Sequence, residues 1–205
     1  MKNYLCINGK KIELTAEQIK QIEGSMKVKG TETKLKSIPV GETFKLGKYE
    51  FIVLEHSKDT TAVILKNLLY ESERFGSNNN YNGSYVEGLC DKFATEIMKI
   101  VGKENLIEHT VDLTADDGLK DYHKVKRYMS LLTATLYRRY VEILDKYMIK
   151  KWWWLATPFS TPKHDGANWV KCVSPSGYVY YDFYYFNSSG VRPFCILNSS
   201  IFVSE

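Results

Sequence analysis

The chain has 205 residues, of which 44% are hydrophobic and 25% charged, and its formal net charge is +4. The length suits one well-packed domain or a domain with a small appendage, and the composition is ordinary for a soluble globular protein. The Lys and Arg residues are scattered, so the nucleic-acid footprint is weak. No stretch reaches the ~20 apolar residues of a membrane helix, and residues 1–14 lack the apolar run of a signal peptide. We therefore expect cytoplasmic synthesis without membrane insertion, which is compatible with display on a virion or a cell surface.

A hairpin and a helix are predicted at the N-terminus. Residues 4–7 and 11–14 alternate as strands around Asn8-Gly9, which tolerates the positive φ angles of a two-residue turn. Thr15 and Gln18 form the capping pattern of a helix. Residues 24–39 are polar and predict a linker. This divides the chain into an appendage at residues 1–38 and a main domain at residues 39–205.

The main domain is predicted to be α+β. It opens with strands at residues 43–46, 49–55 and 61–69, and a loop at residues 77–83 precedes the helix cap Ser84. Apolar residues at helical spacing predict helices over residues 85–100 and 133–147, the second with Leu136, Tyr140 and Leu144 inward. From Trp152 onward the pattern is typical of short strands with long loops.

Motifs for catalysis or metal binding are not found in the sequence. The four cysteines (Cys6, Cys90, Cys172 and Cys195) form no CxxC pair, and the four histidines have no HxH or HxxxH spacing. Asp116-Asp117 is more typical of a loop or helix start than of a catalytic pair. Nucleophile-elbow, phosphate-loop and dinucleotide motifs are missing as well. We expect no cofactor, no metal and no enzymatic activity.

A binding surface is predicted in the last third of the chain. Seven of the twelve residues from Tyr178 to Ser189 are Tyr or Phe, and none of the twelve is cationic. Tyr supplies contact area at little entropy cost, and Ser and Asn adapt their hydrogen bonds. An ordinary aromatic strand pair would have a similar composition. The candidate ligand-binding residues are His164, Asp165, Asn168, Trp169, Tyr178, Tyr180, Tyr181, Asp182, Phe183, Tyr184, Tyr185, Phe186, Asn187 and Ser188.

The scaffold of this surface is expected to include both main helices, Trp152, Trp154 and Arg192. Trp152 and Trp154 alternate with Trp153 on a strand, so the first two are assigned to the core and Trp153 to the opposite face. Arg192 lies beside an apolar strand and is expected to anchor loop carbonyls or a carboxylate.

The same residues resemble a domain of unknown function that is common in gut Firmicutes and their phages. Its pattern runs as W-L-R-S-P, a Tyr/Ser/Asn-rich strand pair and then G-V-R-P. The matching blocks here are residues 153–158, Trp169-Val170, Ser176-Gly177 and residues 190–194, and the resemblance covers roughly residues 40–198. Ala156-Thr157 stands where Arg-Ser is common in the family, which puts any role of that Arg in doubt.

The resemblance implies a C-type lectin-like fold, similar to the variable proteins of diversity-generating retroelements and to formylglycine-generating enzymes. Retroelement mutagenesis acts on adenines and cannot create Lys, Glu, Gln, Met or Trp, and none of these five occurs between Val173 and Ser204. The calcium-ligating triplets of animal C-type lectins are absent, so calcium-dependent sugar binding is not implied. The contexts of Cys172 and Cys195 do not resemble the copper-binding motif of the enzymes.

We therefore expect a non-catalytic variable protein that binds a protein or cell-surface ligand. One alternative is a structural component of a phage particle that uses the aromatic face for assembly. A less favoured alternative is a modifying enzyme of the formylglycine-generating type, which would need two close, reactive thiols.

Overall fold

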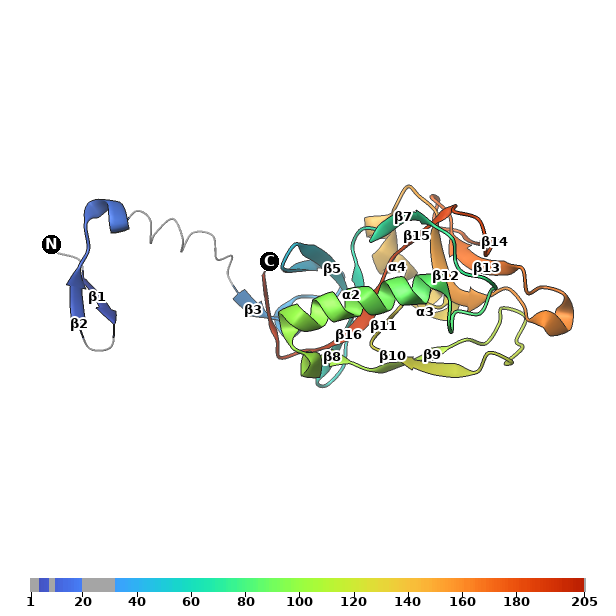
Figure 1. The fold of residues 1–205 in the computed structure, drawn as a ribbon, viewed down its shortest axis with the longest axis horizontal. Coiled ribbons are helices and arrows are strands. Elements are labelled where there is room, and N and C mark those ends of the chain that lie inside the picture. The colour runs from blue at the N-terminus through green and yellow to red at the C-terminus, as the bar shows by residue number, and fades with distance from the viewer. Residues whose placement is uncertain (1–3, 8–9, 20–31, 205) are drawn as a thin grey trace.

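The computed structural model describes residues 4–7, 10–19 and 32–204 (Figure 1). The predicted hairpin is present, because β1 (Tyr4–Ile7) pairs antiparallel with β2 (Lys10–Glu13); its Asn8-Gly9 turn lies outside the described residues. The predicted helix start is also confirmed. The Thr15 N–H donates to Gln18 Oε1 at 3.0 Å, and the Gln18 N–H donates to Thr15 Oγ1 at 3.3 Å.

The segment just before residue 39 is part of the main domain and not a linker. β3 (Glu32–Lys34) pairs with the C-terminal strand β17 (Phe202–Ser204). The short helix η1 (Leu35–Ser37) follows, and Leu35 and Ile38 are buried in the core. Two well-placed apolar side chains outweigh the polar composition of this segment. The linker predicted over residues 24–39 is therefore wrong from Glu32 onward, and its earlier part lies outside the described residues.

The larger sheet has eight strands in the order β11-β16-β6-β5-β4-β17-β3, with β8 also paired to β16. All of its pairs are antiparallel. The three strands predicted at its start are present, although the third ends at Leu65 and not at Leu69. The further strands of this sheet are β4 (Thr43–Leu46), β5 (Tyr49–His56), β6 (Thr60–Leu65), β8 (Leu106–Ile107), β11 (Met129–Ser130) and β16 (Phe194–Asn198).

The smaller sheet has five strands in the order β14-β13-β12-β15-β7, which leaves β14 at an edge. Only the β12–β15 pair is parallel. A separate two-stranded ribbon, β9 (His109–Asp112) with β10 (Lys124–Arg127), lies along one side of the molecule (Figure 1). The strands of the smaller sheet are β7 (Tyr70–Glu73), β12 (Trp153–Pro158), β13 (Trp169–Val173), β14 (Val179–Phe183) and β15 (Ser189–Val191).

The long helix α2 (Tyr85–Val101) begins and ends where the sequence indicates. Ser84 Oγ accepts a hydrogen bond from the Glu87 N–H at 3.1 Å, as expected of an N-cap. Gly102 follows the last turn with φ of +86°, a conformation that only glycine adopts without strain. Of the apolar residues at helical spacing that predict this helix, Leu89, Phe93 and Ile97 are buried, whereas Tyr85 and Ile100 are exposed.

The second predicted helix is broken into three pieces. α3 (Ala134–Arg139) and α4 (Val141–Leu144) meet at Tyr140, whose φ of −107° and ψ of 12° leave the helical range, and η3 (Asp145–Tyr147) follows. The buried Tyr140 also donates its hydroxyl to Glu55 Oε2 at 2.6 Å. Tyr137, Tyr140 and Leu144 face inward, while Leu136 is only partly buried.

Two clusters of buried side chains hold these layers together. One lies between the strands and α2 and contains Trp154, and the other lies on the side of α3 and α4 and contains Trp153. Neighbouring residues of β12 point to opposite faces, so both tryptophans are buried because the strand is covered on both sides. Trp152 precedes the strand and is exposed, so its assignment to the core is wrong.

Arg192 acts as the expected anchor. Its side chain is 1% exposed, and Nε and Nη2 donate to the carbonyl oxygens of Leu65 and Lys66 at 2.9 Å each. The guanidinium also lies 5.2 Å from the Trp153 ring centroid. Burial lowers the pKa of Arg192 to about 10. Arg192 therefore links the end of β15 to the end of β6. Together, the mostly antiparallel sheets and the few helices form an α+β fold.

Candidate functional site

The predicted aromatic segment forms the outer strand of the smaller sheet and the turn after it. Among the described strands, β14 pairs only with β13, with Cys172 opposite Tyr180 and Trp169 opposite Phe183. Tyr178 stands out most, with 73% of its surface exposed. Phe186 folds back over this turn, its N–H donating to the Phe183 carbonyl at 3.1 Å. The strand edge therefore carries large apolar side chains into solvent.

Ring-to-ring contacts join these side chains into one surface. Tyr181 packs on Phe159 at 4.8 Å between ring centroids, Trp169 packs on Phe183 at 5.4 Å, and Tyr185 packs on Phe186 at 4.8 Å. Phe183 also contacts the rings of Tyr185 and Phe186, which completes the cluster. We call this the aromatic surface, and define it as the contacting rings together with the exposed Tyr178 that precedes β14. Its members are Trp152, Phe159, Trp169, Tyr178, Tyr180, Tyr181, Phe183, Tyr185 and Phe186.

A partly buried ion pair, formed by the buried Lys171 and the more exposed Asp116, lies beside the rings of the aromatic surface. Lys171, on β13, is 7% exposed, and its Nζ donates to Asp116 Oδ2 at 3.0 Å. The same ammonium lies 5.6 Å from the ring centroid of Phe159 and 5.8 Å from that of Tyr181. Arg138 also contacts Asp116, at 3.4 Å. The cation supports two surface rings while its charge is neutralised by Asp116.

The loop between β12 and β13, residues 159–168, lies beside this surface and is held by Asn79, which is fully buried. Its amide donates to the carbonyls of Ser160 at 2.8 Å and Trp169 at 3.0 Å, and its Oδ1 accepts from the Tyr122 hydroxyl at 2.7 Å. Gly166, inside the loop, has no room for a side chain, because an added Cβ would lie 2.3 Å from Ser160 Cβ. The loop backbone is therefore fixed from its inner side.

Two aspartates hold the same loop from its outer side. Asp117 accepts from the Ser160 hydroxyl at 2.6 Å and pairs with His164 Nδ1 at 3.1 Å. Asp121 accepts from the Thr161 hydroxyl at 3.0 Å. The Ser160 bond lowers the pKa of Asp117, and an ion pair with Lys163 lowers that of Asp121. Asp116 and Asp117 are thus loop residues with separate partners, as the sequence indicates.

The predicted site residues do not all share one face. His164 is exposed beside Asp117, and Asp165 is exposed with a left-handed φ of 54°. Tyr184 is partly buried against the core, and its N–H donates to the Asn168 carbonyl at 3.2 Å. Asn187 is exposed, and its carbonyl accepts from Ser72 at 2.5 Å.

Three contributors to the site were not predicted as ligand contacts. Phe159 adds a ring beside Trp169 and Tyr181, Trp152 adds a ring beside Tyr180, and Lys171 lies near the Phe159 and Tyr181 rings. Phe159 directly follows the buried strand β12, but nothing in the sequence places it against β14. Trp152 was assigned to the core because it alternates with the buried Trp154. Sheet pairing, which the sequence does not reveal, brings these residues together.

A small hollow of about 240 Å³ opens at the Trp152 end of the aromatic surface. Its lining is Trp152, Tyr180, Tyr181, Asp182 and Ser188. The Trp152 and Tyr180 rings meet at 60° with centroids 5.9 Å apart, and the Tyr180 and Tyr181 rings are parallel at 5.0 Å. Asp182 Oδ2 accepts from the Ser188 hydroxyl at 2.5 Å.

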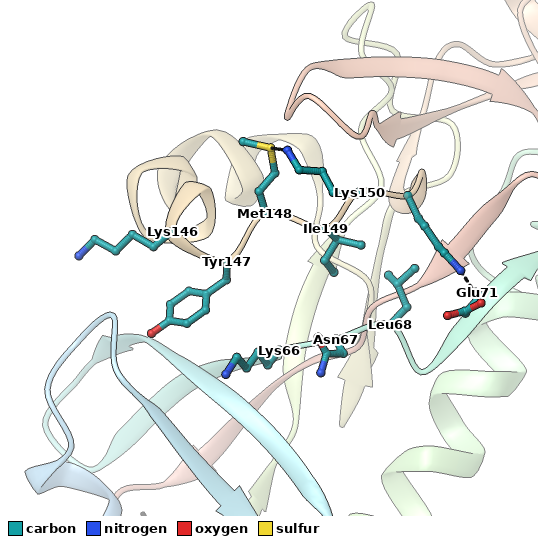
Figure 2. Close-up of a pocket in the computed structure, with 10 residues that line it drawn as sticks. Lys66, Asn67, Leu68, Glu71, Lys146, Tyr147, Met148, Ile149 and Lys150 are labelled. Carbon is teal, nitrogen blue, oxygen red and sulfur yellow. Dashed lines mark hydrogen bonds and ion pairs between the residues drawn. The ribbon is translucent and has the colours of Figure 1, made fainter.

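A larger hollow of about 560 Å³ lies where the segment after α4 faces the segment after β6 (Figure 2). Its floor includes Leu68 and Ile149. Lys66 is paired with Glu50 at 2.9 Å, and Lys151 is paired with Glu71, so these two charges are already compensated. It contains none of the predicted site residues. Its lining is Lys66, Asn67, Leu68, Glu71, Lys146, Tyr147, Met148, Ile149, Lys150 and Lys151.

The described part of the chain shows neither a metal-binding cluster nor a membrane-spanning helix. Residues 4–7, 10–19 and 32–204 contain no group of three or more His, Cys, Asp or Glu side chains that could hold a metal ion. None of the helices in these ranges has the length and apolarity needed to span a bilayer. Comparison with known proteins gave no match to a family model, a curated protein or a solved structure.

Proposed function

We propose that this protein binds a protein or cell-surface ligand through the aromatic surface and does not act as an enzyme. The observation that carries the proposal is the continuous ring cluster on the exposed edge strand β14. Monomeric proteins rarely expose contiguous apolar patches of this kind without a partner. Exposed Tyr and Trp are also the side chains that dominate binding energy at interfaces.

The support beneath the surface is suited to this function. The Lys171–Asp116 pair and the Asn79 amide fix the strand and the loop from below, so the exposed rings need little ordering on binding. Exposed rings contribute little to folding, so their identities can vary while the support stays constant. These properties favour the variable protein of a diversity-generating retroelement with a C-type lectin-like fold. The α+β architecture and the codon-compatible composition of residues 173–204 support that proposal.

The test of a display surface is tolerance to substitution. Tyr178→Ser, Tyr180→Ser and Tyr185→Ser should each lower the free energy of unfolding by about 0.5 kcal/mol or less, which shifts Tm by roughly 1–2 °C. The matched control is Tyr137→Ser, since Tyr137 is 4% exposed and packs on Trp153. That change should cost about 3 kcal/mol or more. Losses of several degrees at all three exposed positions would assign these rings to folding and reject the proposal.

Diversification is tested separately by comparing close copies of the gene from one population. Differences concentrated at pyrimidine-ended codons between residues 164 and 189, on a nearly constant scaffold, would support a retroelement target. A constant segment at residues 178–189 would instead favour a fixed partner, including another subunit of a particle. Sedimentation across a range of protein concentrations separates that case, because an assembly surface should produce larger species as concentration rises.

A further inference from the structure

The carboxylate of Asp182 lines the small hollow and has only neutral hydrogen-bond donors. Its Oδ1 accepts from the Phe183 N–H at 2.8 Å, and its Oδ2 accepts from the Ser188 hydroxyl at 2.5 Å. Among the described residues no Lys, Arg or His side chain forms an ion pair with it. The two hydrogen bonds fix the carboxylate in place without neutralising it.

The lysines near the hollow form ion pairs with other carboxylates. Lys171, on the neighbouring strand, donates to Asp116, and Lys151, which directly precedes Trp152, pairs with Glu71. A half-buried negative charge without a counter-ion is an unusual feature of a resting surface, since the partial desolvation of a carboxylate costs free energy. A cation that enters the hollow would offset this cost, because it would pair with the Asp182 carboxylate.

The aromatic rings around Asp182 also favour a cation in the hollow. Trp152 and Tyr180 meet at 60°, and Tyr181 lies parallel to Tyr180, so aromatic rings line the hollow from more than one direction. The face of an aromatic ring carries negative potential and attracts ammonium and guanidinium groups, with Trp the strongest. A volume of about 240 Å³ suits a side chain better than a whole small molecule.

We propose that this hollow receives a cationic side chain, lysine or arginine, from the partner protein. The inference rests on the proposed function, because it assigns one position on the aromatic surface to a basic anchor. The cation pairs with Asp182 while its alkyl stem or guanidinium plane packs on Trp152 and Tyr180. The remaining rings make apolar contacts around it. The partner's epitope therefore contains a Lys or Arg beside apolar residues.

The experiment titrates the full chain with N-acetyl-arginine amide and follows the indole N–H resonance of Trp152 by NMR. N-acetyl-citrulline amide is the neutral isostere of the probe. We expect saturable binding in the millimolar range for the arginine probe, weakened by salt, and binding at least about fivefold weaker for the citrulline probe. Equal binding of the two probes, or no shift with either, would overturn the assignment of a cation site.

Asp182→Asn is the decisive variant, because an amide preserves the shape of the side chain while removing its charge. The amide oxygen can still accept from the Phe183 N–H, and the Ser188 hydroxyl must then rotate to accept from the amide NH2. It should weaken binding of the arginine probe by roughly fivefold or more. The matched control is Asp59→Asn, an exposed carboxylate in the turn between β5 and β6 that does not line the hollow, which should leave binding unchanged. If Asp182→Asn retains native affinity while the exposed Tyr variants still fold normally, the cation site fails and the binding surface stands. If those Tyr variants unfold, the proposed function itself fails.

Discussion

At Gly190, the closeness of neighbouring atoms leaves no room for a side chain. A Cβ at this position would lie 2.4 Å from Leu68 Cδ1 and 2.7 Å from the Tyr70 carbonyl oxygen. The leucine can move, but the carbonyl belongs to the backbone of β7, which pairs with β15. Glycine is therefore required for β15 to fit between β7 and β12.

We expect Gly190→Ala to lower the free energy of unfolding by about 1–3 kcal/mol, because the backbones of β15 and β7 must separate. The control is Gly88→Ala, since Gly88 is exposed inside α2 and an added Cβ would meet nothing within 4 Å. That change should stabilise the protein by roughly 0.5–1 kcal/mol. Urea denaturation measures both. A neutral Gly190→Ala would mean that the strand has room to shift.

His109 couples the stability of the ribbon to pH. The ring is 9% exposed, its Nε2 lies 2.9 Å from Ser130 Oγ, and it packs edge-on against Phe194 at 5.2 Å. Burial lowers the pKa of His109 from its ordinary value of 6.5 to about 4. Because the folded state disfavours the charged ring, its contribution to stability is complete above pH 6.5 and is lost as the pH falls toward 4.

The His109 contribution predicts a loss on the order of 3 kcal/mol between pH 6.5 and pH 4. His109→Gln, which cannot take up a proton, should flatten this slope even if it lowers stability at pH 7. His123→Asn serves as the control, because His123 is exposed and Asn tolerates its φ of 56°. Chemical denaturation at a series of pH values gives the slope. An unchanged slope in His109→Gln would assign the effect to other groups.

At the scale of elements, the loop between β12 and β13 is fixed by side chains from distant segments. Asn79 comes from the loop before α2, and Asp117 and Asp121 come from the loop between β9 and β10. Each of them bonds to residues 160–169, next to the aromatic surface. The loop therefore needs no regular secondary structure of its own to hold a stable position.

Asn79→Ala should destabilise the protein by about 1–3 kcal/mol, because the buried Ser160 carbonyl loses the Asn79 donor and the Trp169 carbonyl keeps only its bond from the Phe159 N–H. Amide hydrogen exchange in residues 159–169 should rise by more than exchange in α2. Asn78→Ala is the matched control, since Asn78 is exposed and accepts only a local bond from the Asn80 N–H at 2.9 Å. Equal effects at the two positions would indicate that the loop is held mainly by its outer aspartates.

The elements that could be predicted from the sequence are those specified locally. The capping pairs at Thr15 and Ser84 and the helical spacing through α2 depend on neighbours along the chain, and these predictions are confirmed. The break at Tyr140 could not be predicted, because it accompanies a hydrogen bond to Glu55 on β5. The end of the linker was missed because β3 is stabilised by pairing with β17.

The same distinction applies to the candidate site. The exposure of Tyr178, Tyr180 and Tyr185 follows from composition, since several tyrosines cannot all be buried with satisfied hydroxyls. The positions of Phe159 and Lys171 depend on the register between β13 and β14 and on the path of the loop. Tyr184 turns inward because it packs against the core from the end of β14. Tyr184 is therefore not part of the aromatic surface, although its neighbours Phe183 and Tyr185 are.

At the scale of the whole molecule, three cysteines are buried in one cluster. Cys90, Cys172 and Cys195 are free and inaccessible, and burial raises the pKa of Cys90 and of Cys172 to about 12 and that of Cys195 well above its ordinary value. A thiol with a raised pKa is a poor nucleophile at neutral pH, because little thiolate is present. This opposes the thiol chemistry of a formylglycine-generating-type enzyme.

A Cys6→Ser variant leaves only these three thiols to titrate. We expect negligible reaction with Ellman's reagent in the native protein and complete reaction after unfolding in guanidinium chloride. The native rate should follow global unfolding, since each thiol lies inside the core. Rapid native modification of Cys172 or Cys195 would show access to the cluster and reopen the enzyme alternative.

The pairing of β3 with β17 also determines how the domain can be attached to anything else. Within the domain of residues 32–204, β3 lies at one end and β13 and β14 lie toward the other (Figure 1), and β17 lies beside β3 because the two strands pair. A support joined to the chain ahead of Glu32 therefore holds the domain by its base, with the aromatic surface facing away. Immobilisation through this end should leave the surface free for selection, whereas a fusion in the turn at residues 184–188 would block it.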